Sequence, residues 1–123
     1  MLVREMRFKV VEFEDALKQV RKLAQEKLDE GDNADEFVEL GDADGVKFYV
    51  TAGKHIRDVA SDEFHENPRD SFIWVLEGEM EFTFENGEKT TVRKGQCFVF
   101  PKHLRHRCVF KKMTITLEGV YEE

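Results

Sequence analysis

Two stretches of the chain, related in mirror order, constrain its fold more than any other feature. The first, residues 64–78 (FHENPRDSFIWVLEG), carries His65 in a polar segment that precedes a dense apolar run. The second, residues 95–106 (GQCFVFPKHLRH), begins with the apolar run and ends at His106. Short apolar runs bounded by Gly, Pro and Asn are typical of strands. The mirror order therefore predicts two strand pairs folded onto one another.

A hairpin signal lies between the two stretches. The dipeptide Asn86-Gly87 separates two alternating runs, and both of its residues tolerate the positive φ of a tight hairpin turn. A two-residue turn would place Phe82 opposite Thr91, whereas a three-residue loop with a bulge at Gly87 would place Phe82 opposite Val92. We predict the second register, because it aligns the apolar faces.

Folding the chain about this turn also brings the two stretches together. Residues 71–76 then lie alongside residues 96–100, and the segment that holds His65 lies near the segment that holds His106. Although these two histidines are far apart in the sequence, we expect them to be neighbours on adjacent strands.

The two stretches resemble the paired motifs of the cupin superfamily, a group of small jelly-roll barrels that are also called double-stranded β-helices. The first family motif, G-x5-H-x-H-x3,4-E-x6-G, is matched through His65, Asn67, Ser71 and Gly78. The second motif, G-x5-P-x-G-x2-H-x3-N, is matched through Gly95, Pro101 and His106, with His103 in place of its Gly and Phe110 in place of its Asn. The resemblance covers roughly half of the chain and implies an all-β cupin barrel.

The resemblance also implies a divalent-metal site. Family members usually hold the metal through two His and one Glu of the first motif and the His of the second. Here these positions hold His65, Asn67, Ser71 and His106, so two imidazoles remain beside an amide and a hydroxyl. His65, His106 and Asn67 are thus the candidate ligands for Zn, Fe, Mn or Ni. Because transition metals prefer imidazole and anionic ligands, binding should be weaker than the family's usual, and a metal-free barrel stays equally open.

Four other residues are candidate contacts for a small-molecule ligand. Ser71 and His103 occupy positions in the motifs. Residues 54–60 are expected to form a further strand, on which His55, Arg57 and Val59 share one face. If that face is inward, His55 and Arg57 contact the ligand, and otherwise they are exposed or salt-bridged.

A basic run, residues 101–112, holds five Lys or Arg and no acid. One interpretation is that its field attracts an anionic ligand to the mouth of the barrel. The other is that the run forms a solvated or subunit-contact face.

The N-terminal part of the chain lies outside the motifs. Residues 6–11 are expected to form a short strand, and residues 14–29 an amphipathic helix that ends at Gly31. The helix is predicted from apolar residues at helical spacing: Phe13, Leu17, Val20, Leu23, Ala24 and Leu28. We expect residues 1–34 to pack as an extension on the barrel, which comprises residues 35–123 and begins with strands at 36–40 and 46–52.

Alternation along residues 71–76 predicts which side chains point into the barrel. Ser71, Ile73 and Val75 should face inward, and Phe72, Trp74 and Leu76 should face outward. An outward apolar stripe needs cover from the N-terminal helix or from a second subunit. We therefore expect a homodimer.

Net charge and the distribution of apolar residues argue against several other classes of protein. A net charge of −7 and a pI near 5.2 argue against a nucleic-acid-binding protein. No apolar run reaches the length of a membrane span, and the N-terminus MLVREMRF lacks the apolar core of a signal peptide, so a cytoplasmic protein without a membrane partner is expected. Cys97 and Cys108 are then expected to be reduced core thiols, with a thiolate ligand or a disulfide as lesser alternatives.

Two classes of function remain open on the sequence alone. The first is a small-molecule-binding cupin with a degenerate divalent-metal site and metal-dependent activity, which the resemblance implies would be of dioxygenase, isomerase or lyase type. The second is a metal-free, non-catalytic binding or sensing cupin. Even without a metal, His65 and His106 could act as acid and base, because imidazole titrates near neutral pH. No catalytic residue is assigned.

Overall fold

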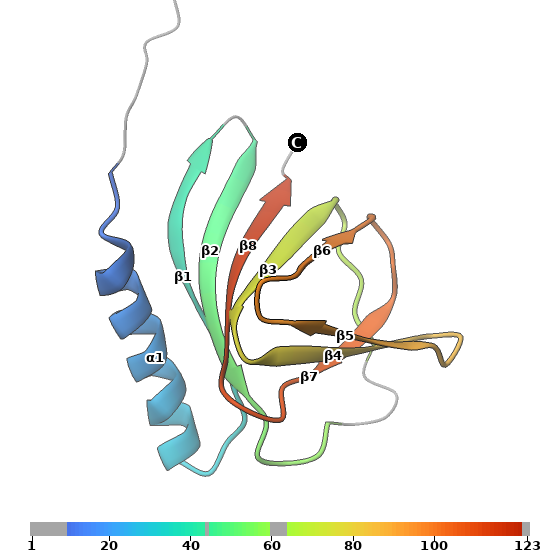
Figure 1. Cartoon of the computed structure of the whole chain (residues 1–123), viewed down its shortest axis with the longest axis horizontal. Coiled ribbons are helices and arrows are strands. Elements are labelled where there is room, and N and C mark those ends of the chain that lie inside the picture. The colour runs from blue at the N-terminus through green and yellow to red at the C-terminus, as the bar shows by residue number, and fades with distance from the viewer. Residues whose placement is uncertain (1–9, 44, 60–63, 122–123) are drawn as a thin grey trace, which may run out of the picture.

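The computed structural model describes residues 10–43, 45–59 and 64–121, which form one helix and eight strands. The strands build two antiparallel sheets, with the orders β1-β2-β8-β3-β6 and β5-β4-β7, that face one another (Figure 1). The jelly-roll barrel with an N-terminal helix is therefore confirmed. The elements are α1 (Phe13–Asp29), β1 (Ala34–Ala43), β2 (Val46–Lys54), β3 (Ser71–Glu77), β4 (Glu79–Phe84), β5 (Lys89–Arg93), β6 (Cys97–Phe100), β7 (His106–Val109) and β8 (Thr114–Tyr121).

Helix α1 forms where the 3.6-residue periodicity predicts it. Gly31, with a φ of 82°, ends the helix, and the N–H groups of Gly31 and Asp32 donate to the carbonyls of Leu28 and Lys27, both at 3.0 Å. This pairing is the Schellman motif, which needs a left-handed residue at the position of the glycine. Of the predicted strand over residues 6–11, residues 6–9 lie outside the described residues, and Val10 and Val11 are not in a strand.

The apolar stripe of α1 packs on the outer face of the five-stranded sheet. This helix–sheet core is built from small and branched side chains, so the helix can approach the sheet closely. Its buried members are Ala16, Val20, Ala24, Ala34, Val50, Ala52 and Ile115. Within the described residues, no helix is long and apolar enough to cross a membrane.

The predicted pairing of the two motif strands is confirmed. Strand β3 pairs with β6 from Ser71 opposite Phe100 to Trp74 opposite Cys97. The predicted alternation also holds, because Ser71, Ile73 and Val75 are buried whereas the side chain of Trp74 is 48% exposed on the outer face. A second core, between the two sheets, contains Ile73, Val75, Met80, Phe82, Val92, Phe100 and Phe110.

The predicted hairpin register is wrong by two residues along β5. Gly87 has a φ of 90° and donates to the carbonyl of Phe84 at 2.9 Å, so the three-residue loop with a left-handed glycine does form. Phe82, however, lies opposite Thr90, and Met80 lies opposite Val92. Phe82 does not need Val92 as a partner, because the rings of Phe98 and Phe100 in the facing sheet pack against it.

The strand expected over residues 54–60 is also wrong, because β2 ends at Lys54 and the described residues that follow, 55–59, form no strand. The chain turns there because the side-chain oxygen of Asn33 accepts hydrogen bonds from the N–H groups of Ile56 and Arg57, both at 2.8 Å. His55 and Arg57 therefore do not share a strand face. The expected strands over residues 36–40 and 46–52 are present within the longer strands β1 and β2.

Candidate functional site in the barrel interior

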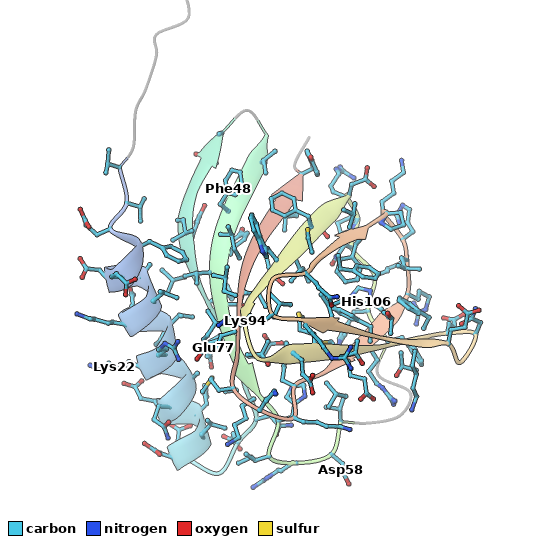
Figure 2. The ribbon with its side chains drawn as sticks, in the orientation of Figure 1. Lys22, Phe48, Asp58, Glu77, Lys94 and His106 are labelled. Carbon is cyan, nitrogen blue, oxygen red and sulfur yellow. The ribbon has the colours of Figure 1, made fainter. Side chains whose placement is uncertain are left out.

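His65 and His106 are direct neighbours, as predicted. Each donates its backbone N–H to the carbonyl of the other at 2.8 Å, in an antiparallel bridge. Residues that exchange both hydrogen bonds in this way are directly opposite and project their side chains to the same face. That face is the inner face of the barrel, because the ring of His106, labelled in Figure 2, contacts two core rings. The ring centroids of Phe100 and Phe82 lie 4.7 and 5.9 Å from that of His106. His106 is half-buried there, whereas His65 is exposed to solvent.

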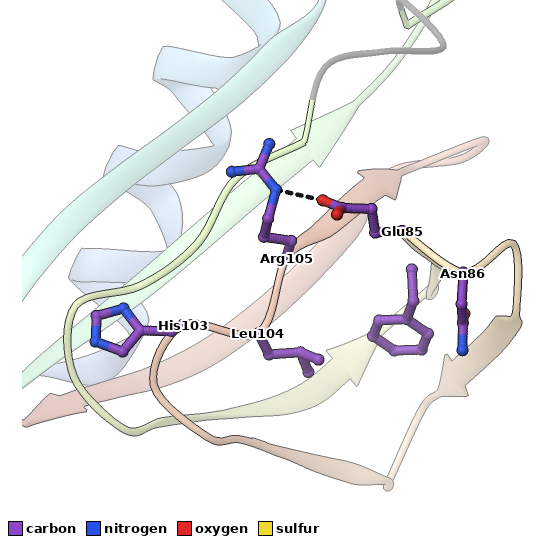
Figure 3. Close-up of a pocket in the computed structure, with 6 residues that line it drawn as sticks. Glu85, Asn86, His103, Leu104 and Arg105 are labelled. Atoms are coloured by element: carbon purple, nitrogen blue, oxygen red, sulfur yellow. Dashed lines mark hydrogen bonds and ion pairs between the residues drawn. The ribbon is translucent and has the colours of Figure 1, made fainter.

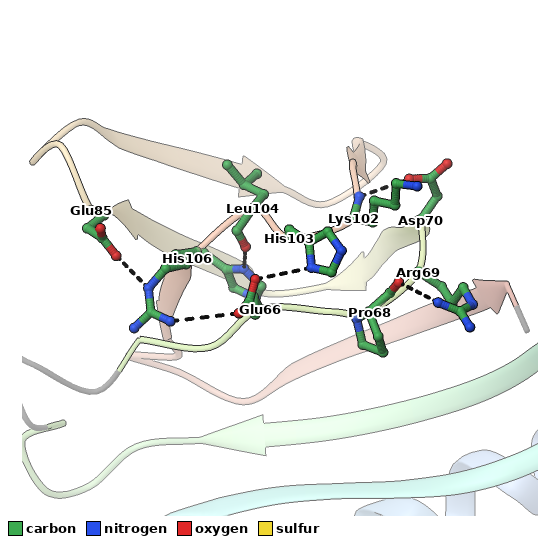
Figure 4. Close-up of polar contacts among 10 residues, drawn as sticks. Glu66, Pro68, Arg69, Asp70, Glu85, Lys102, His103, Leu104 and His106 are labelled. Atoms are coloured by element: carbon green, nitrogen blue, oxygen red, sulfur yellow. Dashed lines mark hydrogen bonds and ion pairs between the residues drawn. The ribbon is translucent and has the colours of Figure 1, made fainter.

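The imidazole of His106 is held in one tautomer. Its Nδ1 lies 2.8 Å from the carbonyl oxygen of Leu104, and because a carbonyl only accepts, Nδ1 carries the proton (Figure 4). Burial lowers the pKa of His106; the bond to Leu104 opposes this effect, and the charge of His65 adds to it. His106 is thus a neutral imidazole at pH 7, and its Nε2 is a lone-pair acceptor or ligand.

Asn67 and Ser71 occupy the other two positions at which the family resemblance places metal ligands, and they bond to each other. The side-chain amide of Asn67 donates to Ser71 Oγ at 3.1 Å. Ser71 is buried, and its hydroxyl is neutral. An amide oxygen and a hydroxyl are weak ligands for a transition metal. In the part of the chain that the structure describes, no group of three His, Cys, Asp or Glu is placed to hold a metal ion.

Sequence reasoning missed two carboxylates in the barrel interior, Asp35 on β1 and Glu118 on β8. Glu118 pairs with Tyr49 and Ile73, and Asp35 pairs with Gly53. Paired residues share a face, and Ile73 belongs to the core between the sheets, so Glu118 faces inward. Asp35 faces the same way, because its partner Gly53 pairs with Thr114, which lies four residues before Glu118 on β8. The sequence signal was only partial: the alternation of β8 places Thr114, Thr116 and Glu118 on one face and Ile115 on the other. The structure shows that Ile115 packs towards α1, so the face of Glu118 is the inner one.

The protein environment perturbs both carboxylates. Burial raises the pKa of Asp35, and the charges of His55 and His65 partly oppose that rise. Burial, reinforced by the charge of Asp35, raises the pKa of Glu118 to about 7. The side chain of Asp35 is nevertheless exposed and that of Glu118 is partly exposed, so solvent reaches the inner face of this sheet.

The cysteines occupy different faces and form no disulfide. Cys108 pairs with Phe82 on the inner face, and burial raises its pKa, so the thiol is protonated. Cys97 is exposed and pairs with Trp74 on the outer face. The expectation of two buried thiols is therefore wrong for Cys97.

We call the six inward groups the inner polar cluster: Asp35, His55, His65, His106, Cys108 and Glu118. His55 belongs to it because its charge acts on Asp35, while its Nδ1 accepts from the N–H of Phe110 at 3.1 Å. Arg57 does not belong to it, since Arg57 is exposed and its backbone contacts Asn33.

His103, the remaining predicted contact, lies at the rim and not in the interior. Its φ of 65° is in the left-handed region, which explains why the family motif has a glycine at this position. Its Nδ1 lies 3.3 Å from Glu66 (Figure 4). The rim carries an open pocket of about 310 Å³, which includes neither His65 nor His106 (Figure 3). The pocket is lined by Phe84, Glu85, Asn86, His103, Leu104 and Arg105.

Acidic neighbours offset the basic run of residues 101–112. Arg105 forms an ion pair with Glu85 (Figure 3) and lies 4.0 Å from Glu66. Lys111 lies 3.4 Å from Glu81. The acids offset the positive charge of Arg105 and Lys111, which weakens the attraction that the run would exert on an anion. For these two residues, the pairs support the interpretation of a solvated or subunit-contact face.

Comparison with known proteins agrees with the two motifs. Residues 54–116 match a family model described as Cupin domain. A segment of 47 residues is 34% identical to 3-hydroxyanthranilate 3,4-dioxygenase of Jannaschia sp. (strain CCS1). That match covers 36% of this chain and 26% of the relative, so it spans about a quarter of the relative's length.

Solved structures with low sequence identity share the fold. A cupin-2 domain-containing protein from Shewanella frigidimarina superimposes with a TM-score of 0.68 and 16% identity, over 92% of this chain and 95% of that one. An RmlC-like cupin with a double-stranded β-helix fold from Methanocaldococcus jannaschii gives a TM-score of 0.59 and 12% identity, over 72% and 81% of the two chains.

Proposed function

We propose that this chain, which belongs to the cupin domain family, binds a small molecule at the inner polar cluster. The proposed binding does not require a metal ion. The observation that carries the proposal is the arrangement of His106. Its Nδ1 is engaged by Leu104, and its Nε2 is an acceptor on an inner face that solvent reaches. Binding sites commonly combine such a fixed polar group with an aromatic lining, which Phe82 and Phe100 supply here.

The donor set argues against a tightly held metal. Two imidazoles remain at the positions where the family places its ligands, but the amide and the hydroxyl at the other two bond to each other. Three strong ligands are the usual minimum for a catalytic divalent ion. His65 and His106 alone do not meet that requirement, so no step of the proposed function passes through a metal.

A second candidate is a weak divalent-metal site with metal-dependent activity. The tautomer of His106 supports it, because an imidazole whose Nδ1 donates to a carbonyl presents Nε2 as a metal ligand should. His65, His106 and Asn67 would hold Zn, Fe, Mn or Ni, and the ion would supply Lewis-acid or oxygen chemistry. The short match to a dioxygenase is compatible with this candidate.

Elemental analysis separates the two candidates. The chain is expressed in metal-replete medium and compared with His106→Ala and with the control His103→Asn, which tolerates the positive φ at the rim. We expect all three samples to contain far less than one metal ion per chain. A stoichiometric ion that is lost in His106→Ala but kept in His103→Asn would establish the second candidate.

A thermal-shift screen of metabolites on chelator-treated protein tests the binding itself. We expect at least one compound to raise the melting temperature of the wild type and of His103→Asn, but not that of His106→Gln. Stabilisation that is equal in His106→Gln would contradict the proposed location. Stabilisation that needs an added divalent metal would favour the second candidate.

A further inference from the structure

We propose that Asn86, at the tip of the β4–β5 hairpin, is a site of spontaneous chemical modification, which converts its side-chain amide into a mixture of aspartate and isoaspartate. The co-reactant is water, and neither an enzyme nor a metal ion takes part. The inference goes beyond the proposed function and does not depend on it, because Asn86 lines the rim pocket and does not belong to the inner polar cluster.

The reaction joins the side chain of Asn86 to the main chain of Gly87. The main-chain nitrogen of Gly87 attacks the side-chain carbonyl carbon of Asn86 and forms a cyclic succinimide. The bond from that carbon to the amide nitrogen breaks, and ammonia leaves with the proton that the Gly87 nitrogen gives up. Water then adds to either carbonyl of the ring and opens it, which gives aspartate or isoaspartate. No oxidant or reductant is needed, and proximity of the two groups drives the first step.

The first observation is that the attacking nitrogen belongs to an uncrowded glycine. Asn86 and Gly87 are both exposed at the hairpin tip, and Figure 3 shows Asn86 on that loop. A Cβ built on Gly87 would have no heavy atom of a non-neighbouring residue within 4 Å. Because Gly87 carries no side chain and nothing packs against it, the side chain of Asn86 can approach its nitrogen without a steric barrier.

The second observation is that the other two asparagines of the chain, Asn33 and Asn67, lack these conditions. Asn67 precedes Pro68, whose nitrogen carries no hydrogen to give up, and its amide donates to Ser71 Oγ at 3.1 Å. Asn33 precedes Ala34, which is fully buried. The Oδ1 of Asn33 also accepts two backbone N–H groups of the loop after β2, both at 2.8 Å. Asn86 is therefore the asparagine of this chain that is suited to the reaction.

The third observation is that two hydrogen bonds must open before the ring can close. The N–H of Gly87 donates to the carbonyl of Phe84 at 2.9 Å, and Oδ1 of Asn86 accepts from the N–H of Glu88 at 3.0 Å. Both bonds lie at the exposed tip of a hairpin, where local opening costs little free energy. The reaction should therefore be slower in the folded protein than in the unfolded chain, but faster than at the other two asparagines.

The two products change the rim of the barrel in different ways. Aspartate adds a negative charge between Glu85 and Glu88, beside the rim pocket that Asn86 lines. Isoaspartate also adds a carbon atom to the main chain. It thereby lengthens the loop that is closed by the hydrogen bond from the N–H of Phe84 to the carbonyl of Glu88, at 2.8 Å. Modification should disturb the hairpin tip and leave the inner polar cluster unchanged.

The test follows all three asparagines in one sample. The folded chain is incubated for several weeks at mildly alkaline pH, beside the same chain unfolded in urea. Peptide mapping by mass spectrometry measures the acid form at each asparagine, and an isoaspartate-specific protein methyltransferase detects isoaspartate. In the folded chain we expect Asn86 to be converted at least about 10-fold faster than Asn33 or Asn67, which corresponds to a barrier lower by about 1.4 kcal/mol. Unfolding should accelerate the conversion of Asn86.

Two variants at the exposed tip separate the chemistry of the Asn-Gly pair from exposure alone. Asn86→Gln should lose the isoaspartate signal, because its longer side chain would have to close a larger ring. In the matched control Glu88→Asn, the new asparagine is equally exposed but precedes Lys89 instead of a glycine. It should be converted more slowly than Asn86 in the same molecule. Circular dichroism spectra that overlay that of the wild type show that each variant is folded.

Three results would overturn the proposal. In the first, Asn86 of the folded chain is converted no faster than Asn33 and Asn67. In the second, the two tip asparagines of Glu88→Asn are converted equally fast, so that exposure alone accounts for the rate. In the third, isoaspartate persists in Asn86→Gln and so arises at another residue. The proposed function can fail in the thermal-shift screen without changing any of these results.

Discussion

Glu118 shows how the fold changes the chemistry of one residue. On a solvated strand its carboxylate would ionise near pH 4.5, but inside the barrel burial and Asp35 raise its pKa to about 7. Desolvation penalises the charged form, and a nearby negative charge adds to the penalty. The folded protein therefore holds a proton on Glu118 over a range of pH in which the unfolded chain has released it.

The pH dependence of stability should report this proton. Between pH 4.5 and about 7 the native state binds more protons at Glu118 than the unfolded state does, so the free energy of unfolding falls as the pH rises. The loss attributable to Glu118 is on the order of 3 kcal/mol and levels off above pH 7. Urea denaturation across this range should give a flatter profile for Glu118→Gln than for the wild type. Parallel profiles would show that Glu118 ionises normally in the fold.

A buried hydroxyl pair gives a second prediction for single residues. Thr51 and Thr116 lie on adjacent strands, are almost fully buried, and hydrogen-bond through their side chains. Thr116→Val should lower the free energy of unfolding by about 1–2 kcal/mol, because it leaves the hydroxyl of Thr51 without its partner. The double variant with Thr51→Val should lose less than the single variant in urea denaturation. A double variant that loses the sum of the two single effects would contradict this account.

Whether an inward-facing residue could be predicted from the sequence depends on whether it lies in one of the two motifs. His65 and His106 could be paired from the sequence because they stand in two recognisable motifs on either side of a hairpin. Asp35 and Glu118 stand outside the motifs, and their alternating strands do not reveal which face is inward. That face depends on α1, which covers Ile115 and so turns Glu118 towards the interior.

At the scale of elements, α1 contributes to stability through a few small side chains that fit closely against β1 and β2. Val20 is fully buried in this core. Val20→Ala should lower the free energy of unfolding by about 2 kcal/mol, from lost burial and from the cavity that remains. Gln19→Ala, on the exposed face of the same helix, should change it by less than about 0.5 kcal/mol. Equal effects of the two substitutions would show that the helix does not depend on this contact.

The positions of helices and turns could be predicted from local sequence patterns. The register and the ends of strands were harder to predict, because contacts with residues distant in the sequence determine them. The periodicity and Gly31 locate α1 closely, and Asn86-Gly87 locates the hairpin. The register of that hairpin depends on Phe98 and Phe100 in the other sheet, which the hairpin's own sequence does not contain. The end of β2 likewise depends on Asn33, which binds the chain beyond it.

At the scale of the whole molecule, α1 leaves part of the outer sheet surface uncovered. The outer apolar patch consists of Phe72, Trp74, Val99 and Tyr121, and the last three are 48%, 69% and 48% exposed. Strands β3 and β6 carry most of it, and Figure 1 shows α1 beside β1, at the opposite edge of the same sheet. We propose that a second copy of the chain covers this patch in a homodimer.

Sedimentation velocity tests the dimer. The wild type should sediment as a dimer and Trp74→Glu as a monomer, because a charge would be buried at the centre of the patch. Ile56→Glu, at an equally exposed apolar position in the loop after β2, should remain a dimer. A wild type that stays monomeric at high concentration would refute the proposal.

We propose that this barrel binds its ligand at the inner polar cluster, in contact with His106, and not in the open pocket at the rim. A crystal structure of the chain with the compound that stabilises it most in the thermal-shift screen would distinguish these two locations. We predict ligand density within hydrogen-bonding distance of His106 Nε2 and beside His65. Density confined to the rim pocket between Phe84 and Arg105, with the interior side chains unchanged, would contradict it.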